Sequence, residues 1–463
     1  MDDTPDVGQL LSALRTGRNS DACTRAAQGV AALFVSPSQL RAREALCKQG
    51  VLPALGGVLS AHTLNRSAAA VPACCRAISA LARGPGTPAA TEALHSSGPE
   101  VVQRLTDLVS PRPVDAATTC ALDALAALLT ASHACREAAV ACNCCVKLGD
   151  LVLGPNTTQG QPSEAASSAA QCAAELAQLG SGREGLRPSF PALTKAVQQA
   201  GLDNAPGAYA CLALLRCAHD DGLRSMLHDG GRAAWTVLDT KCSSGVTGDP
   251  SPPSRPGGRL AAVLLIGLLF CHVKDGNPGA AKLLSRFEAP KHLAALLDAA
   301  LAEQRAAQAR DQDSHPARIL PPGSFTAYGV PWSNAEVVLY SRFCSEHPAL
   351  VTSMADYGTH AKLGSLLAAA AVSGTLPQHH PGLVFDATVA SAACASRDLV
   401  TAAAREFRAA ENAFSAAREM LEVPVSNAIA SMCCSAQPHD GGGGAHGDDS
   451  GDEGAAGAVV RAR

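Results

Sequence analysis

The chain has 463 residues, of which 37 are basic and 41 acidic, so its formal net charge is −4. Hydrophobic residues make up 47% of the sequence but aromatic residues only 3%, and alanine is abundant at the apolar positions. This composition predicts closely packed helices, because sheets favour β-branched and aromatic side chains. The near balance of charge excludes a polycation that binds nucleic acids or membrane surfaces through its net charge.

The N-terminal sequence MDDTPDVGQLL is acidic, whereas secretory and transit segments carry basic residues there, so we expect neither. The 18 cysteines are then expected to be free thiols in a reducing compartment. The most apolar run, Leu260–Cys271, is well short of the roughly 20 residues that span a bilayer, and we predict a buried helix. We therefore expect a cytoplasmic protein without a membrane span, with the nucleus or a cilium as alternative locations.

In chain order, the clearest pattern lies in Leu40–Leu81, which predicts three successive short helices. Leu40–Gln49 is amphipathic and ends at Gly50. Val51–Leu59 follows, with leucines at helical spacing on one face, Leu55 among them. A third helix begins after a polar break. A unit of this size cannot bury its apolar face alone, so it requires a similar unit on each side.

A looser copy of this unit recurs along the chain. The N-terminal segment Val7–Leu14 is similar to its second helix. The expected junctions before the second helices are Gly50, Gly98, Asn143, Pro188, Gly231, Glu288 and Gly358. Most of them lie about 45 residues apart, a period that is typical of helical repeat proteins.

Two insertions lengthen this period near the C-terminal end. Residues 242–258 are rich in proline, glycine and serine, and residues 302–330 begin as a helix extension and end in a proline-rich stretch. Asp386–Leu421 is predicted to form closing helices with a polar outer face. The glycine- and aspartate-rich residues 431–463 lack apolar periodicity and are predicted to be a disordered tail. We therefore predict one helical domain over residues 1–430, followed by this tail.

The segment Ala45–Ser60, ALCKQGVLPALGGVLS, resembles the repeat of the armadillo family. Similar segments recur at Leu94–Val109, Met226–Leu238 and Met354–Leu367, so the resemblance covers roughly residues 6–421. It implies an all-α fold, a right-handed α-solenoid superhelix of about eight armadillo-like repeats. In such a fold the third helices line a concave surface that binds other proteins.

In peptide-binding members of the family, an asparagine of each third helix holds the backbone of an extended peptide. The matching positions here are Ala32, Ala80, Gln178 and Leu268. Because few side-chain amides remain, we expect these residues to line a surface for a partner's amphipathic helix, bound through i, i+3, i+4 and i+7 anchors. The tryptophan array of the nuclear-import adaptors is also missing, which argues against an import receptor. The sequence has no U-box-like region, which argues against a ubiquitin ligase.

The densest cysteine group consists of Cys135, Cys142, Cys144 and Cys145. Zinc requires convergent ligands, whereas on a helix Cys144 points away from the face that Cys142 and Cys145 share. Because free cysteine packs like a small apolar residue, we interpret this group as structural, together with Cys74–Cys75 and Cys433–Cys434. His379–His380 and the tail histidines are interpreted as solvated loop residues. We therefore expect no metal and no cofactor.

The sequence contains no G-x-S-x-G, H-E-x-x-H, phosphate-loop or dinucleotide motif. We therefore expect a protein that is not an enzyme, with no small-molecule substrate and no nucleic-acid partner. Ser450 lies in DDSGDE with Glu453 three residues on, a context that suits an acidophilic kinase. Phosphorylation would add roughly −1.5 to −2 charges to the tail; an unmodified, solubilising tail is the alternative.

Three functional hypotheses follow. The first is a scaffold or adaptor that binds protein partners along its concave surface. The second is an armadillo-like regulator of a GTPase, an exchange factor or chaperone, which would place the function in the two insertions. The third is a structural subunit of a large ciliary or organellar assembly. The sequence identifies no partner.

Overall fold

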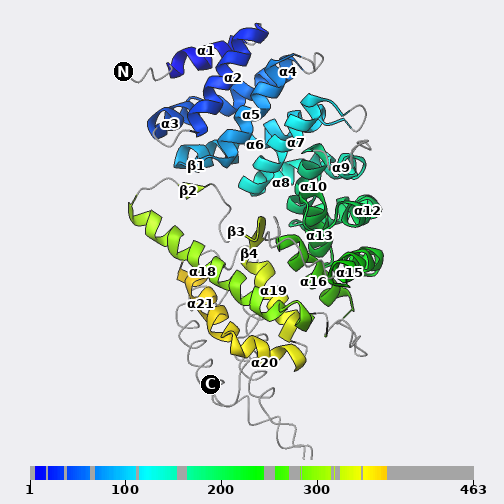
Figure 1. The fold of residues 1–463 in the computed structure, drawn as a ribbon. Coiled ribbons are helices and arrows are strands. Elements are labelled where there is room, and N and C mark those ends of the chain that lie inside the picture. Colours follow the sequence, from blue (N-terminus) through cyan, green and yellow to red (C-terminus); the bar gives the residue numbers. More distant parts are fainter. Residues whose placement is uncertain are drawn as a thin grey trace, which may run out of the picture.

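The computed structural model describes residues 6–16, 19–35, 39–62, 68–110, 114–153, 164–243, 256–270, 282, 284–313, 317–318, 324–345 and 348–372. Nearly all of them belong to helices, which stack in chain order into an elongated solenoid (Figure 1). The all-α repeat architecture predicted from the sequence is therefore confirmed. The closing helices of residues 386–421 and the tail lie outside the described residues, so the domain boundary at residue 430 stays a prediction.

The solenoid consists of units of two or three helices. The first three units contain α1 (Val7–Thr16), α2 (Ser20–Val35), α3 (Leu40–Lys48), α4 (Val51–Ala61), α5 (Ala70–Arg83), α6 (Pro88–Leu108) and α7 (Ala116–Ala131). The fourth and fifth contain α8 (His133–Ala141), α9 (Cys144–Val152), α10 (Glu164–Leu176), α11 (Gly180–Gly185), α12 (Phe190–Ala200) and α13 (Ala205–Cys217). The sixth contains α14 (Asp221–Arg224), α15 (His228–Ser243) and α16 (Pro256–Phe270).

The C-terminal part adds helices and short strands. The helices are α18 (Ala289–Asp313), α19 (Asn334–Ser345), α20 (Pro348–Asp356) and α21 (Thr359–Val372). The strands are β1 (Pro85–Gly86), β2 (Ala317–Arg318), β3 (Ser324–Ala327) and β4 (Val330–Ser333). Strands β3 and β4 form an antiparallel hairpin, and β2 pairs antiparallel with the distant β1.

Short-range sequence signals explain where several helices begin. Thr87, Asp115 and Ser132 each accept a hydrogen bond from the backbone N–H three residues further on, which caps α6, α7 and α8. Four of the predicted junctions, Gly50, Asn143, Glu288 and Gly358, lie before second helices in the left-handed backbone region, which favours glycine.

Two of the predicted junctions were wrong. Gly98 lies inside the continuous helix α6, and Gly231 lies inside α15. Both glycines allow close helix packing instead of a turn. A Cβ atom at Gly98 would lie 2.5 Å from the Sγ atom of Cys135 in α8, and one at Gly231 would lie 2.7 Å from Leu269 in α16.

The insertions are also more ordered at their ends than predicted. Helix α15 continues through residue 243 and α16 begins at residue 256, so helices enter both ends of the first insertion. In the second, α18 extends to Asp313, as expected, but strands β2, β3 and part of β4 follow where no strand was predicted. Elements of the second insertion therefore belong to the folded protein.

The apolar core runs through all units. The predicted buried helix of the apolar run is α16, and Leu260, Leu264 and Leu268 in it are at most 4% exposed. Within the described residues, none of the helices is both long and apolar enough to cross a membrane.

We expect Leu55→Ala to lower the free energy of unfolding by about 2–5 kcal/mol. Leu55 in α4 is fully buried, as its spacing from Leu52 and Leu59 predicted, so the shorter side chain would leave a cavity. Urea unfolding followed by circular dichroism measures this loss. Lys48→Ala, at an exposed position of α3, is the matched control and should stay within about 0.5 kcal/mol; a similarly small effect for Leu55→Ala would contradict the packing.

Candidate protein-binding surface

The candidate site is the surface formed by the third helix of each unit. Helices α2, α5, α7, α10, α13 and α16 pack against one another in this order. Along the first four of these helices, one side remains partly exposed. It carries Gln28, Ala32, Arg76, Ala80, Arg83, Asp123, Thr130 and Gln171, together with Gln178 in the turn after α10. We call these residues the third-helix surface.

Three of the four predicted partner-binding residues lie on this surface. Ala32 is exposed at the end of α2, and Ala80 and Gln178 are half-buried. The prediction for Leu268 was wrong, because Leu268 is only 2% exposed. It lies in α16, which packs against α13, α15, α18 and α19, so a partner cannot reach it in this structure.

Polar side chains connect successive third helices along this surface. In α7, Asp123 accepts hydrogen bonds from the Arg83 guanidinium at 2.7 and 3.0 Å and from the Ser79 hydroxyl at 2.8 Å, both residues of α5. Further on, the Gln171 amide of α10 donates to the Thr130 hydroxyl of α7 at 3.5 Å. The surface therefore offers charges, amides and hydroxyls next to its alanines.

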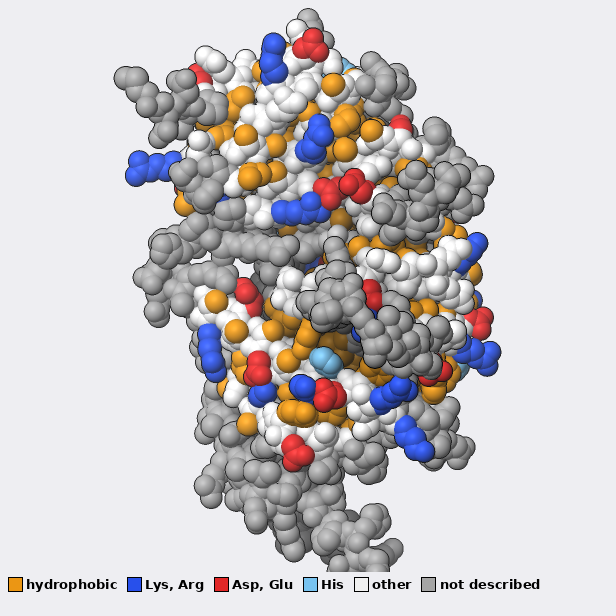
Figure 2. Space-filling model, in the orientation of Figure 1, with side chains coloured by type: hydrophobic (Ala, Val, Ile, Leu, Met, Phe, Trp, Pro, Cys, Tyr) orange, Lys and Arg blue, Asp and Glu red, His pale blue; other side chains and the backbone are white. Residues whose placement is uncertain are grey.

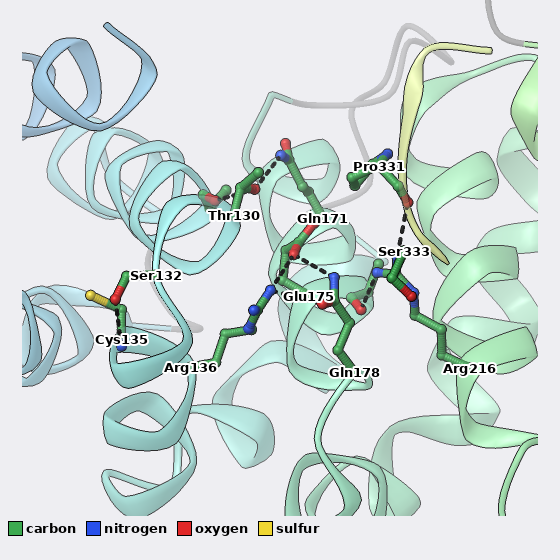
Figure 3. Close-up of polar contacts among 12 residues, drawn as sticks. Thr130, Ser132, Cys135, Arg136, Gln171, Glu175, Gln178, Arg216, Pro331 and Ser333 are labelled. Carbon is green, nitrogen blue, oxygen red and sulfur yellow. Dashed lines mark hydrogen bonds and ion pairs between the residues drawn. The ribbon is translucent and has the colours of Figure 1, made fainter. Parts of the chain in front are cut away.

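Toward the middle of the solenoid, these contacts become buried. The Arg136 side chain of α8 reaches Glu175 at 3.3 Å and the Gln178 side-chain oxygen at 2.8 Å (Figure 3). Gln178 in turn donates to Glu175 at 2.8 Å. The pair is imperfect, because the Nε atom of Arg136 and the Oε1 atom of Glu175 are buried without hydrogen-bond partners in the structure.

A second buried arginine, Arg216 of α13, joins the solenoid to the C-terminal elements. Its guanidinium donates two hydrogen bonds to Glu336 of α19 at 2.5 and 3.2 Å. It also donates to the carbonyl oxygen of Pro331 in β4 at 2.8 Å (Figure 3) and to that of Ala174 in α10 at 2.7 Å. One fully buried side chain thus connects two third helices, the hairpin and α19.

The local sequence positions the carboxylate that receives Arg216. Ser333 and Glu336 form a capping box at the start of α19: the Ser333 N–H donates to Glu336 Oε2 at 2.7 Å, and the Glu336 N–H donates to the Ser333 hydroxyl at 3.2 Å. Close by, the Tyr340 hydroxyl lies 2.8 Å from His219 Nε2. Burial lowers the pKa of His219 to about 3, so its imidazole is neutral at pH 7.

The two buried ion pairs differ in their electrostatic balance. Burial alone would raise the pKa of Glu336, but the charge and hydrogen bonds of Arg216 outweigh it and lower this pKa. For Glu175 burial prevails over the attraction of Arg216 and Arg136, and its pKa is raised. The Arg216–Glu336 pair is therefore favourable in its charged form, whereas ionised Glu175 is only partly compensated.

The hairpin and α19 cover the third-helix side of α13. We call residues 324–345 the plug. Its apolar side chains Phe325, Val330, Trp332, Val337 and Tyr340 are at most 2% exposed, and its turn contacts α16 through a hydrogen bond of 3.0 Å from the Gly257 N–H to the Tyr328 carbonyl oxygen. Among the described residues, the third-helix surface is thus exposed or half-buried along α2 to α10, and it ends where the plug covers α13.

The Arg216–Glu336 connection could not be predicted from the sequence, because 120 residues separate the two partners. Two local signals pointed to them. The sequence SNAE at the start of α19 is typical of a capping box, and Arg216 is the one charged residue in the apolar helix Ala205–Cys217. A buried arginine of this kind requires an acidic partner.

The cysteine residues have structural positions, in agreement with their interpretation. Cys135, Cys144 and Cys145 are buried and Cys142 is half-buried. Burial raises the pKa of the Cys135 and Cys145 thiols to about 11 and that of Cys144 to about 12, so they are poor nucleophiles at neutral pH. Among the described residues, no group of three or more metal-ligating side chains converges.

Several predicted sites lie outside the described residues: Ser450, the pair Cys433–Cys434 and the pair His379–His380.

A hollow of about 1280 Å³ lies between α12 and α15, with Phe190, Met226 and Val237 among its apolar residues and Asp229 and Arg232 among its charged ones. On the face shown in Figure 2, charged side chains of both signs are interspersed without a patch of one sign.

Comparisons with known proteins add little to this picture. No family model and no curated protein match the sequence. An engineered protein from the Northeast Structural Genomics Consortium is similar over 93% of this chain and 98% of its own, with 16% identity and a TM-score of 0.48. A designed armadillo repeat protein in complex with the peptide (KR)4 covers 57% of this chain and 100% of its own, with 15% identity and a TM-score of 0.44. At these scores the similarities carry no argument about function.

Proposed function

We propose that this armadillo-like solenoid is not an enzyme but a scaffold or adaptor that binds a protein partner on the third-helix surface between α2 and α10. The observation that carries the proposal is the continuous stack of third helices, whose side is exposed or half-buried along these four helices in the part of the chain that the structure describes, and is covered by the plug at α13. Repeat solenoids in general use such extended surfaces to bind other proteins. The proposed partner element is an amphipathic helix.

The apolar anchor for this helix is at the N-terminal end of the surface. Ala32 and the 75% exposed Val35 lie at the end of α2, and α2 packs against α5, which carries Ala80. A partner helix brings its backbone hydrogen bonds already satisfied, so it can pack on these small apolar residues without unpaired amides. Gln171 and Gln178 at the other end would meet its polar side chains.

We expect Ala80→Asp to reduce partner capture about tenfold or more, because a partner helix that packs on residue 80 would have to desolvate the new carboxylate where the wild type offers a methyl group. Affinity capture of the intact chain, followed by mass spectrometry, identifies the partner and measures the loss. The control variant Thr236→Asp places the same charge at an exposed position of α15. Unchanged capture by a folded Ala80→Asp protein would contradict this binding surface.

The GTPase-regulator alternative places the function in the insertions. Deleting residues 302–323 would remove half of α18 and all of β2, so loss of binding would not separate a lost contact from a damaged fold. Charge reversal at the exposed Arg305 of α18 tests this alternative more sharply. The assembly-subunit alternative predicts that the native protein elutes from a size-exclusion column far above its monomer mass of 46.9 kDa.

A further inference from the structure

Polar contacts fix how the third helices α5 and α7 lie along one another. The Ser79 hydroxyl of α5 donates to the Asp123 carboxylate of α7 at 2.8 Å, and the Arg83 guanidinium of α5 donates to the same carboxylate at 2.7 and 3.0 Å. Ser79 and Asp123 therefore stand at the same level of two packed helices. Residues three or four positions earlier lie one turn away on the same helix face.

One turn before this contact, each helix carries a cysteine. Cys75 precedes Ser79 by four residues and Cys120 precedes Asp123 by three, so the rise to the two cysteines differs by only about 1.5 Å. Both are free thiols. The electrostatics agree with this placement, because burial and then the neighbouring Cys120 raise the pKa of Cys75. The two thiols are therefore neighbours across the boundary between two repeat units.

The two cysteines differ in their access to solvent. Cys120 is half-buried and lies near the exposed Arg76 of the third-helix surface, whereas Cys75 is fully buried. The adjacent Cys74 is also fully buried, but its thiol neighbour is Cys23 of α2, on the other side of α5. A reagent in solution therefore reaches Cys120 first.

We propose that Cys75 and Cys120 form a redox-sensitive dithiol, in which Cys120 reacts with a low-molecular-weight disulfide such as oxidised glutathione and Cys75 then closes a disulfide between the two units. An accessible thiol beside a second, resolving thiol is typical of such sites. Facing Cα atoms of two packed helices come within about 4–6 Å, and a disulfide bridges about 4.4–6.8 Å. This inference goes beyond the proposed function and does not depend on it.

The reaction consists of two thiol–disulfide exchange steps. In the first, the deprotonated Sγ atom of Cys120 attacks one sulfur of oxidised glutathione, and the other glutathione leaves as a thiolate that takes up a proton. In the second, Cys75 loses its proton and its Sγ atom attacks Sγ of Cys120, which releases the second glutathione as a thiol. Two protein thiols are oxidised, and one glutathione disulfide is reduced.

Peptide mapping by mass spectrometry tests the pair in the native, full-length chain. The protein is incubated with oxidised glutathione at about pH 8.5, where a larger fraction of thiol is deprotonated, and is then alkylated and digested with trypsin. Residues 67–76 contain Cys74 and Cys75, and residues 105–136 contain Cys120 and Cys135. We expect a disulfide between these two peptides that dithiothreitol removes.

Single variants assign the two sulfur atoms. The link between the peptides should be lost in Cys75→Ala and in Cys120→Ala, and it should persist in the matched controls Cys74→Ala and Cys135→Ala. The first two variants also separate the two roles. In Cys75→Ala, glutathione should remain on Cys120 at a level about tenfold or more above the wild type, because the resolving thiol is absent. In Cys120→Ala, the buried Cys75 should stay unmodified.

The absence of a Cys75–Cys120 disulfide from the folded, oxidised wild type would overturn the proposal, and so would a link formed through Cys74 instead. Glutathione that stays on Cys120 of the wild type would also contradict it, because a neighbouring thiol would have displaced it. These outcomes are measured on the wild type, so they hold even where a variant fails to fold. They leave the proposed function standing, because Ala80→Asp tests partner binding separately.

Discussion

Glu336→Gln should lower the free energy of unfolding by about 3–5 kcal/mol, because it leaves the fully buried charge of Arg216 without its counter-ion. The amide can replace part of the hydrogen bonding but not the charge. Urea unfolding monitored by circular dichroism measures the loss. Because Glu336 connects the plug to α13, hydrogen exchange should also increase in β3, β4 and α19.

Two control substitutions test whether the stability loss of Glu336→Gln comes from breaking this particular buried ion pair. Glu175→Gln removes a carboxylate that is also buried and paired with a buried arginine, Arg136. Because burial raises the pKa of Glu175, its ionised form is less stabilised than that of Glu336, so the loss should be smaller than for Glu336→Gln. Glu44→Gln breaks the exposed pair with Lys48 and should also change stability by less than about 1 kcal/mol. Equal losses for Glu336→Gln and Glu175→Gln would contradict the difference between the two buried pairs.

The helical units were predictable because the turn before a second helix uses a backbone conformation that favours glycine or asparagine, and these residues can be recognised in the sequence. Gly50 and Gly358 precede second helices with positive φ angles of 81° and 64°, a conformation that favours glycine. Asn143 with φ of 56° is the residue type that next tolerates it. Gly98 and Gly231 were misassigned because a glycine that permits close helix packing looks the same in the sequence as one that permits a turn.

The C-terminal part was less predictable, because its structure depends on contacts between distant segments. The proline-rich sequence after α18 indicated an interruption of the helices, and that was correct. The return of β2 to β1, more than 200 residues earlier in the chain, depends on the length and direction of α18, which no local pattern specifies. Leu268 was misassigned for the same reason: its place in the repeat was right, but α18 and α19 cover α16.

The two buried glutamates should also give opposite pH dependences. The folded-state pKa of Glu336 is lowered from its ordinary value of 4.5, so its stabilising contribution is present above pH 4.5 and is lost as the pH falls through the lowered pKa. The folded-state pKa of Glu175 is raised from 4.5. Its contribution is therefore fully present below pH 4.5 and is lost as the pH rises through the raised pKa.

Each variant isolates one of these contributions when its unfolding free energy is subtracted from that of the wild type across about pH 4 to 7. The advantage of the wild type over Glu336→Gln should shrink as the pH falls toward the lowered pKa, because protonated Glu336 no longer compensates Arg216. Relative to Glu175→Gln, the wild type should lose stability as the pH rises, because ionised Glu175 has a buried oxygen without a hydrogen-bond partner. The two curves of unfolding free-energy difference against pH should therefore slope in opposite directions. If both slope in the same direction, burial and attraction to arginine balance alike at Glu336 and Glu175, and the distinction between the Arg216–Glu336 and Arg136–Glu175 pairs is wrong.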